Sequence, residues 1–101
     1  IMDVFRNHSP HLIDGIAVVA VEDYKLGIRR GMNGLTERLT LPQANVLKLF
    51  LEDGSWVCIR PSGTEPKCKF YFGVRKDTGE KARDALHQIV RDVMERVKDI
   101  G

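Results

Sequence analysis

The chain has 101 residues, 43% of them hydrophobic and 30% charged, and its formal net charge is +2. This composition is typical of a globular protein, and the length suffices for one domain whose core needs no metal or disulfide. The small net charge does not favour binding to nucleic acid or to an anionic membrane. No apolar run approaches the roughly 18 residues that cross a bilayer. We therefore expect one soluble domain over residues 1–101, cut from a longer protein because it starts at Ile1 rather than at a methionine.

The first forty residues predict the end of a helix, one strand and a long loop. Residues 1–7 carry apolar side chains at helical spacing, and Pro10 ends that helix. The run Ile16–Val21 is continuously apolar, which is typical of a strand buried on both faces. Lys25–Thr40 is polar and shows no clear period, so we expect a long loop or a pair of short turns there.

Three further strands are predicted between residues 46 and 74. Val46–Glu52 alternates, Asp53-Gly54 is a hairpin turn signal, and Trp56–Arg60 is the returning strand. Cys68–Val74 is the last strand, and its alternation puts four apolar side chains on one face: Cys68, Phe70, Phe72 and Val74. One face of the sheet should therefore be apolar, and the other should carry cations.

Residues Asp77 to Lys98 predict one amphipathic helix. Asp77 and Glu80 resemble a capping box. Eight apolar residues then recur at intervals of three and four: Ala82, Ala85, Leu86, Ile89, Val90, Val93, Met94 and Val97. This stripe should cover the apolar face of the sheet, with roughly 1–3 kcal/mol gained for each buried side chain. The predicted class is α+β: a four-stranded antiparallel sheet covered on one face by helix.

Neither a catalytic set nor a metal site is evident. His8, His11 and His87 are scattered and lack a neighbouring pattern of carboxylates or thiols. Cys58 and Cys68 lack CxxC spacing and should point to opposite faces of neighbouring strands. We expect two reduced thiols, and hence a cytoplasmic protein.

Positive charge is local. Lys25, Arg29 and Arg30 form one group, and a second group surrounds the turn between the last two strands: Arg60, Lys67, Lys69, Arg75 and Lys76. The turn itself reads Arg-Pro-Ser-Gly-Thr-Glu-Pro-Lys over residues 60–67. A guanidinium, two hydroxyls and a glycine in one proline-bracketed turn are suited to binding an oxyanion such as phosphate. The alternative is a connecting loop whose polar groups satisfy only their own backbone.

The same turn resembles the phosphate-binding loop of the α-D-phosphohexomutases, the phosphoglucomutases and phosphomannomutases, where it lies in the C-terminal domain. Asp14-Gly15, residues 22–24 and residues 41–47 resemble the phosphoglucomutase branch. The resemblance covers nearly the whole chain. It implies the TATA-box-binding-protein-like fold of the fourth domain of these enzymes.

The resemblance also implies a function. Family members interconvert hexose 1-phosphates and 6-phosphates through a bisphosphorylated intermediate, using a phosphoserine and Mg²⁺ held by the other three domains. This chain would anchor the phosphate that is not being transferred, through Arg60, Ser62, Gly63 and Thr64. Possible supporting residues are Glu65, Lys67 and Lys69, with Glu65 more suited to holding a neighbouring cation than to acid–base chemistry. Alone, the chain would bind phosphosugar weakly and catalyse nothing.

Two other functions stay open at this stage. Trp56 and Tyr71 near Arg60 and Lys69 could form a single-stranded nucleic-acid-binding sheet, although the aromatic residues are few. The same face could also serve only to dock other domains. Glucose or mannose specificity and oligomeric state cannot be read from these residues.

Overall fold

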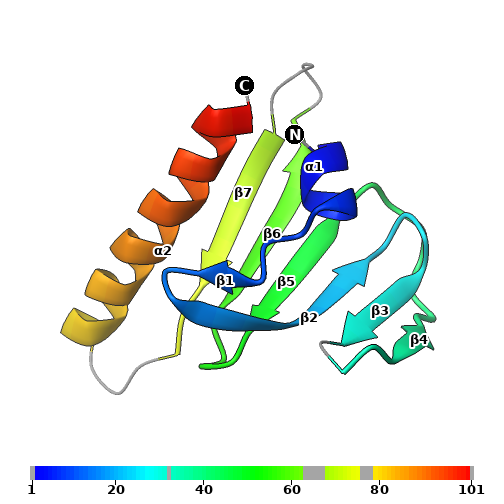
Figure 1. Ribbon diagram of the computed structural model, residues 1–101, viewed down its shortest axis with the longest axis horizontal. Coiled ribbons are helices and arrows are strands. Elements are labelled where there is room, and N and C mark those ends of the chain that lie inside the picture. Colours follow the sequence, from blue (N-terminus) through cyan, green and yellow to red (C-terminus); the bar gives the residue numbers. More distant parts are fainter. Residues whose placement is uncertain (1, 32, 63–67, 76–78, 101) are drawn as a thin grey trace.

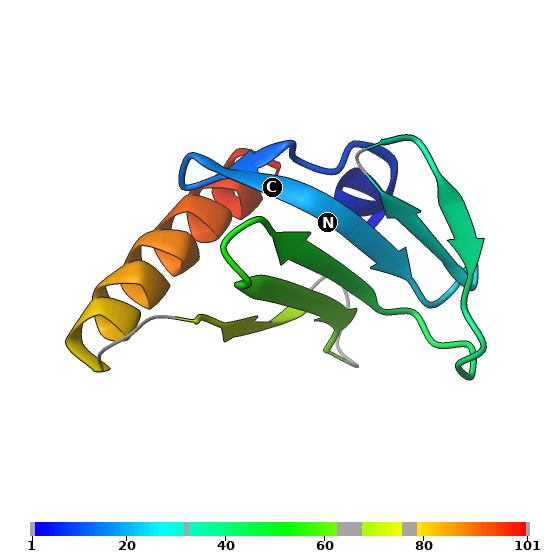
Figure 2. The same cartoon turned by 90° about the horizontal axis from the view of Figure 1, so that it is seen from below.

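The computed structural model describes residues 2–31, 33–62, 68–75 and 79–100. It shows an antiparallel sheet with helices on one side and the other side uncovered (Figures 1 and 2). The elements in chain order are α1 Met2–Asn7, β1 Leu12–Ile13, β2 Ile16–Asp23, β3 Ile28–Gly31, β4 Thr36–Arg38, β5 Leu47–Leu51, β6 Trp56–Pro61, β7 Cys68–Gly73 and α2 Gly79–Ile100. The main sheet has the order β4-β3-β2-β5-β6-β7, and β1 pairs with β2.

The four predicted strands are confirmed as the neighbouring strands β2, β5, β6 and β7. The prediction of a four-stranded sheet is wrong, because β1, β3 and β4 extend it. β3 and β4 lie within Lys25–Thr40, where we expected a loop or turns. Their residues carry no apolar alternation, since β3 is half-buried throughout and β4 is exposed. The fold name implied by the resemblance stays a prediction.

The apolar run in β2 forms the predicted strand, but it is not buried on both faces throughout. Val18, Ala20 and Val21 are buried, whereas Val19 remains 38% exposed. The pairing of β2 with β5 shifts register between Val18 and Ala20. Such an irregularity leaves one residue outside the ladder and turns its side chain toward solvent.

The core lies on the helix-covered side of the sheet. Strand alternation places Leu47, Leu49 and Leu51 of β5 there, together with Val57 and Ile59 of β6, and each is at most 3% exposed. The alternate residues Lys48 and Phe50 of β5 and Trp56 and Cys58 of β6 are only half-buried. On this side α1 adds Phe5, whose ring meets that of Phe70 edge-on at 6.1 Å between centroids.

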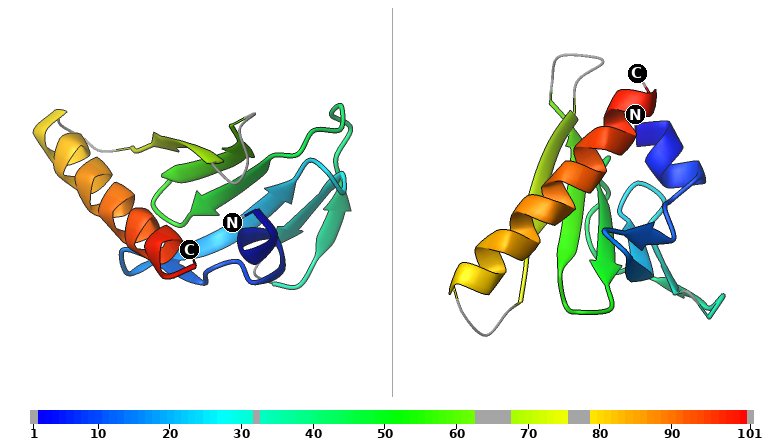
Figure 3. Two further views of the ribbon diagram at one scale, coloured as in Figure 1. Left: turned by 90° about the horizontal axis from the view of Figure 1, so that it is seen from above. Right: turned by 60° about the vertical axis from the view of Figure 1, so that its left-hand side comes forward.

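The helix α2 covers only part of the apolar face, at the side of β1 and β7, with Ile89 and Val93 in the core. It contacts β1 and β7, and its C-terminal half lies on the same side of the sheet as α1 (Figure 3). Ile89 and Val93 are fully buried, but Met94 is 38% exposed, so the expectation of eight buried side chains is wrong. The N-terminal end of α2 projects away from the strands (Figure 2). Asp77 lies outside the described residues, so the capping box is not tested.

A buried ion pair links the N-terminal helix to the sheet. Arg6 Nε donates to the Asp23 carboxylate at 2.9 Å, and the Asp23 side chain is fully buried. The second Asp23 oxygen accepts the backbone N–H groups of Lys25 and Leu26 at 3.1 and 3.2 Å. Arg6 also donates to Asn45 at 2.8 Å. The pair therefore joins α1, the end of β2, the turn toward β3 and the segment before β5.

Cys58 and Cys68 are thiols and do not form a disulfide, as predicted. Cys58 lies opposite Tyr71, and Cys68 lies opposite Pro61 on the other face of the β6–β7 pair. Among the described residues, no helix is long and apolar enough to cross a membrane.

The burial of α2 gives a direct test of its packing. Ile89→Asp should destabilise the protein by several kcal/mol, because it places an unpaired carboxylate in the core. Met94→Asp is the matched control on the same helix and should cost less than about 1 kcal/mol. Urea unfolding followed by circular dichroism measures both. Equal stability of the two variants would contradict this packing.

Candidate functional site

The hairpin of β6 and β7 brings two cations together at the end where the two strands are connected. Arg60 and Lys69 are directly paired across the two strands. Both side chains are exposed and stand on the uncovered face of the sheet, opposite the core residue Ile59. Antiparallel pairing holds the Cβ atoms of such residues about 5 Å apart. Two positive charges are therefore fixed side by side where the chain enters the predicted phosphate-binding turn.

The structure places three of the seven predicted site residues. Arg60 and Ser62 lie at the start of the 60–67 turn, and Ser62 is half-buried. Lys69 follows the turn on β7. Gly63, Thr64, Glu65 and Lys67 lie outside the described residues, as does Pro66. The part of the site that can be described is thus its base, formed by the ends of two strands.

Arg60 and Lys69 lack an ionic partner within the described residues, unlike Arg29 on β3. Arg29 donates to Glu22 at 2.7 Å, and Tyr24 hydrogen bonds the other oxygen of that carboxylate. Burial, followed by the hydrogen bond and charge of Glu22, raises the pKa of Tyr24. On the uncovered face of the sheet, which we call the open face, the positive charge of Arg29 is thus compensated by Glu22. The positive charges of Arg60 and Lys69, at the end of β6 and β7, are not compensated among the described residues.

The field of Arg60 reaches the neighbouring thiol. Burial raises the pKa of Cys58, and the positive charges of Lys48 and Arg60 partly oppose that increase. Cys58 lies two residues before Arg60 in β6, and its partner across the strands is Tyr71. Strand alternation places the side chains of Cys58 and Arg60 on the same, uncovered face of the sheet.

The centre of the open face holds a cation and two aromatic rings that sequence reasoning did not connect. The Lys48 ammonium lies 4.6 Å from the Trp56 ring centroid and 5.1 Å from that of Phe50. Trp56 also lies close against Gly73, where an added Cβ would be 2.3 Å from the indole. Trp56 is thus enclosed between a backbone and an ammonium. The pairing of Lys48 with Cys58 and of Phe50 with Trp56 across the hairpin could have indicated this cluster.

The predicted second group of cations is divided by the structure. Arg75 lies against the β5–β6 turn, since a Cβ on Gly54 would come within 2.9 Å of the Arg75 side chain. Arg60 and Lys69 lie at the other end of the same strands. Lys67 and Lys76 lie outside the described residues.

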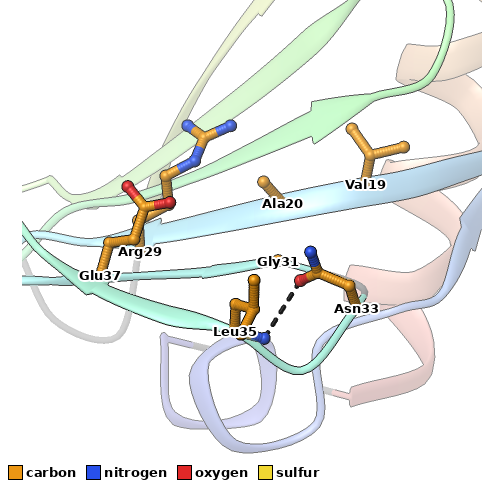
Figure 4. Close-up of a pocket in the computed structure, with 7 residues that line it drawn as sticks. All are labelled: Val19, Ala20, Arg29, Gly31, Asn33, Leu35 and Glu37. Carbon is orange, nitrogen blue, oxygen red and sulfur yellow. Dashed lines mark hydrogen bonds between the residues drawn. The ribbon is translucent and has the colours of Figure 1, made fainter.

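A hollow of about 400 Å³ lies on the open face over β2, β3 and β4 (Figure 4). Its floor is Ala20 and Gly31, and Arg29 and Glu37 stand at one side. Asn33 uses its side-chain oxygen to accept the backbone N–H of Leu35 at 3.1 Å. Neither this hollow nor the larger one beside α1 includes Arg60, Ser62 or Lys69.

The described residues bring together no group of three His, Cys, Asp or Glu side chains that could hold a metal ion. His8 and His11 line the hollow beside α1, and His87 is exposed on α2.

The influence of Arg60 on Cys58 can be tested by alkylation with iodoacetamide at pH 8. Only the thiolate reacts, so removing a nearby positive charge should raise the pKa of Cys58 and slow its labelling. We expect Arg60→Ala to slow it by about twofold to fivefold, the size of a partly screened charge interaction. Arg75→Ala removes the same charge at the far end of the strands and should have no effect. Mass spectrometry of the Cys58 peptide measures the rate; unchanged labelling in Arg60→Ala would contradict the geometry.

Comparisons with known proteins agree with the resemblance. A family model described as "Phosphoglucomutase/phosphomannomutase, C-terminal domain" matches residues 12–95. The phosphoglucomutase of Staphylococcus haemolyticus is 38% identical over 91 residues, which is 89% of this chain and 16% of the relative. That of Staphylococcus saprophyticus is 45% identical over 75 residues, 73% of this chain and 13% of the relative.

The phosphoglucomutase of Staphylococcus aureus is 36% identical over 76 residues. No solved structure matches the chain. The chain spans about a sixth of the length of the curated relatives that it matches. The family match covers most of its residues, including the strands that carry Arg60 and Lys69, and this chain therefore belongs to the phosphoglucomutase/phosphomannomutase family, as its C-terminal domain.

Proposed function

We propose that this chain is a single domain over residues 1–101 that anchors substrate phosphate in a four-domain phosphohexomutase. The parent enzyme would interconvert hexose 1-phosphate and hexose 6-phosphate, with glucose favoured because the relatives named above are phosphoglucomutases. The observation that carries the proposal is the adjacent, uncompensated pair of Arg60 and Lys69 at the entrance to the 60–67 turn.

The chemistry of the turn suits a phosphate that stays bound while the other end of the sugar reacts. The Arg60 guanidinium can donate two parallel hydrogen bonds to phosphate oxygens. Ser62 and Thr64 add hydroxyl donors, and Gly63 permits close approach of backbone N–H groups. Lys67 and Lys69 would add positive charge, and Glu65 would orient a neighbouring cation. Holding a remote phosphate orients the reacting end of the substrate and lowers the entropic cost of reaction.

The proposed anchor recognises phosphate and not a particular carbon of the sugar. It can therefore accept either phosphate of a bisphosphorylated intermediate, as a reversible mutase needs. The family resemblance assigns the phosphoserine and the Mg²⁺ that assists the transfer to the other domains of the parent. We expect a cytoplasmic enzyme whose C-terminal domain is inactive alone.

The open face does not favour the nucleic-acid alternative. A stacking platform needs an aromatic ring with a free face. Trp56 instead lies between Gly73 and the Lys48 ammonium, with the latter 4.6 Å from the ring centroid. Phe50 is approached by Arg29 at 5.0 Å as well as by Lys48. Tyr71, 44% exposed, is left as a candidate for stacking, which is too little for a single-strand track.

The proposal predicts a specific loss of phosphosugar binding. In the full parent enzyme, Arg60→Ala should lower kcat/KM by about tenfold to a hundredfold, because a charge-assisted hydrogen bond contributes roughly 1.5–3 kcal/mol. Arg60→Lys should restore part of it, since an ammonium keeps the charge but loses the two-pronged geometry. Arg75→Ala, at the far end of the strands, is the matched control and should stay within about twofold.

The 101-residue chain offers a binding test that does not need catalysis. Glucose 1-phosphate and glucose 6-phosphate should shift the amide NMR signals of residues 60–69, whereas glucose should not. Normal turnover by the Arg60→Ala parent, together with amides that ignore both phosphosugars, would refute the anchoring function.

A further inference from the structure

We infer that the chain has a second oxyanion site, on the opposite face of the sheet from Arg60. A hollow of about 600 Å³ lies between the segment that joins α1 to β1 and the strands β2 and β3. Its lining comes from α1 and the following segment, from β2 and β3, and from α2: Arg6, Asn7, His8, Ser9, Pro10, His11, Val21, Arg30, Gly31 and Arg96. Three arginines and two histidines line it, and it has no carboxylate among these residues.

Arg30 is the cation of this hollow that lacks a carboxylate partner among the described residues. Arg6 is neutralised by Asp23 at 2.9 Å, and Arg96 by Asp92 at 3.0 Å. Arg30 instead donates Nη2 to the backbone oxygen of Arg6 at 3.1 Å. Its Nε is buried without a hydrogen-bond partner. The charge of this guanidinium is therefore not compensated by a carboxylate among the described residues, and its position in the lining suits it to an anion supplied from outside.

The position of Arg30 follows from strand alternation. Arg29 and Arg30 are consecutive in β3, so their side chains leave opposite faces. Arg29 pairs with Glu22 and lies over Phe50 on the open face. Arg30 is paired with Val21 and faces the core side, where α1 stops short of covering the sheet. The site is therefore separate from the proposed phosphate anchor at Arg60.

The chemistry of the lining points to a phosphate group as the ligand. Guanidinium and imidazole groups donate hydrogen bonds to oxyanions, and the lining offers no carboxylate to attract a metal cation. The Ser9 hydroxyl donates to the Phe5 carbonyl, and the lining residues that can donate to an anion include Arg30, Asn7, His8 and His11. The volume accommodates inorganic phosphate or the phosphate of a small ester.

A phosphate titration of the 101-residue chain, read by amide NMR at constant ionic strength, tests this site. Inorganic phosphate should give saturable shifts at residues 7–11 and 30–31, and Arg30→Gln should weaken them at least tenfold. Arg29→Gln is the matched control, since it removes the same charge from the same strand and should leave those shifts unchanged. Arg60→Ala should abolish shifts at residues 60–69 while preserving those at residues 7–11, which separates the two sites.

Glycerol 3-phosphate distinguishes the two sources of the phosphate group. Tighter binding than inorganic phosphate assigns the site to a phosphorylated metabolite, and equal binding assigns it to free phosphate. If Arg30→Gln fails to fold, Arg30→Lys replaces it and should lose at least threefold, because an ammonium keeps the charge but loses the planar guanidinium geometry. The inference is overturned if the wild-type shifts at residues 7–11 do not saturate, or if Arg29→Gln weakens them as much as the Arg30 variant does.

Discussion

The buried ion pair of Arg6 and Asp23 is the constraint on which the arrangement of the chain depends. A fully buried carboxylate is tolerable only with charge and hydrogen-bond partners, and breaking such a pair typically costs about 3–5 kcal/mol. Asp23 therefore fixes three segments at once: α1 through Arg6, the turn into β3 through two backbone N–H groups, and the approach to β5 through the bond of Arg6 to Asn45. The backbone carbonyl of Arg6 also accepts a hydrogen bond from the Arg30 side chain of β3.

The sheet built on this constraint has two faces with different electrostatic demands. On the core face, apolar packing dominates, and charge enters only where it is paired or at the margin beside β3. On the open face, Arg29 is neutralised by Glu22, and Lys48 lies against two aromatic rings. Arg60 and Lys69 have neither kind of compensation among the described residues. Their mutual repulsion is a cost that a bound phosphate would remove, which is the physical basis of the proposed anchor.

The sequence predicts those parts of the fold in which apolar residues carry a period. The alternation of Leu47, Leu49 and Leu51 and the Asp53-Gly54 turn locate β5 and β6, and counting across the hairpin pairs Arg60 with Lys69. Apolar alternation does not reveal β3 and β4, because β3 is held by the Arg29–Glu22 ion pair, a bond from Arg30 to the Arg6 carbonyl and backbone pairing, and β4 by backbone pairing with β3. The apolar stripe of α2 predicts a helix, but a stripe does not reveal how much partner surface exists. Ile89 and Val93 are fully buried against the rest of the structure, whereas Met94 stays partly exposed.

The two arginines of β3 show why charge in a strand has to be divided by face before it is interpreted. In the sequence, Lys25, Arg29 and Arg30 form one positive group. In the structure, Lys25 is exposed in a turn, Arg29 belongs to the open face, and Arg30 belongs to the core side. Each arginine therefore meets a different environment, and only that of Arg30 leaves a buried donor without a partner. Because side chains alternate between the two faces of a strand, one sheet can hold separate anion sites, with Arg60 of β6 on the open face and Arg30 of β3 on the core side.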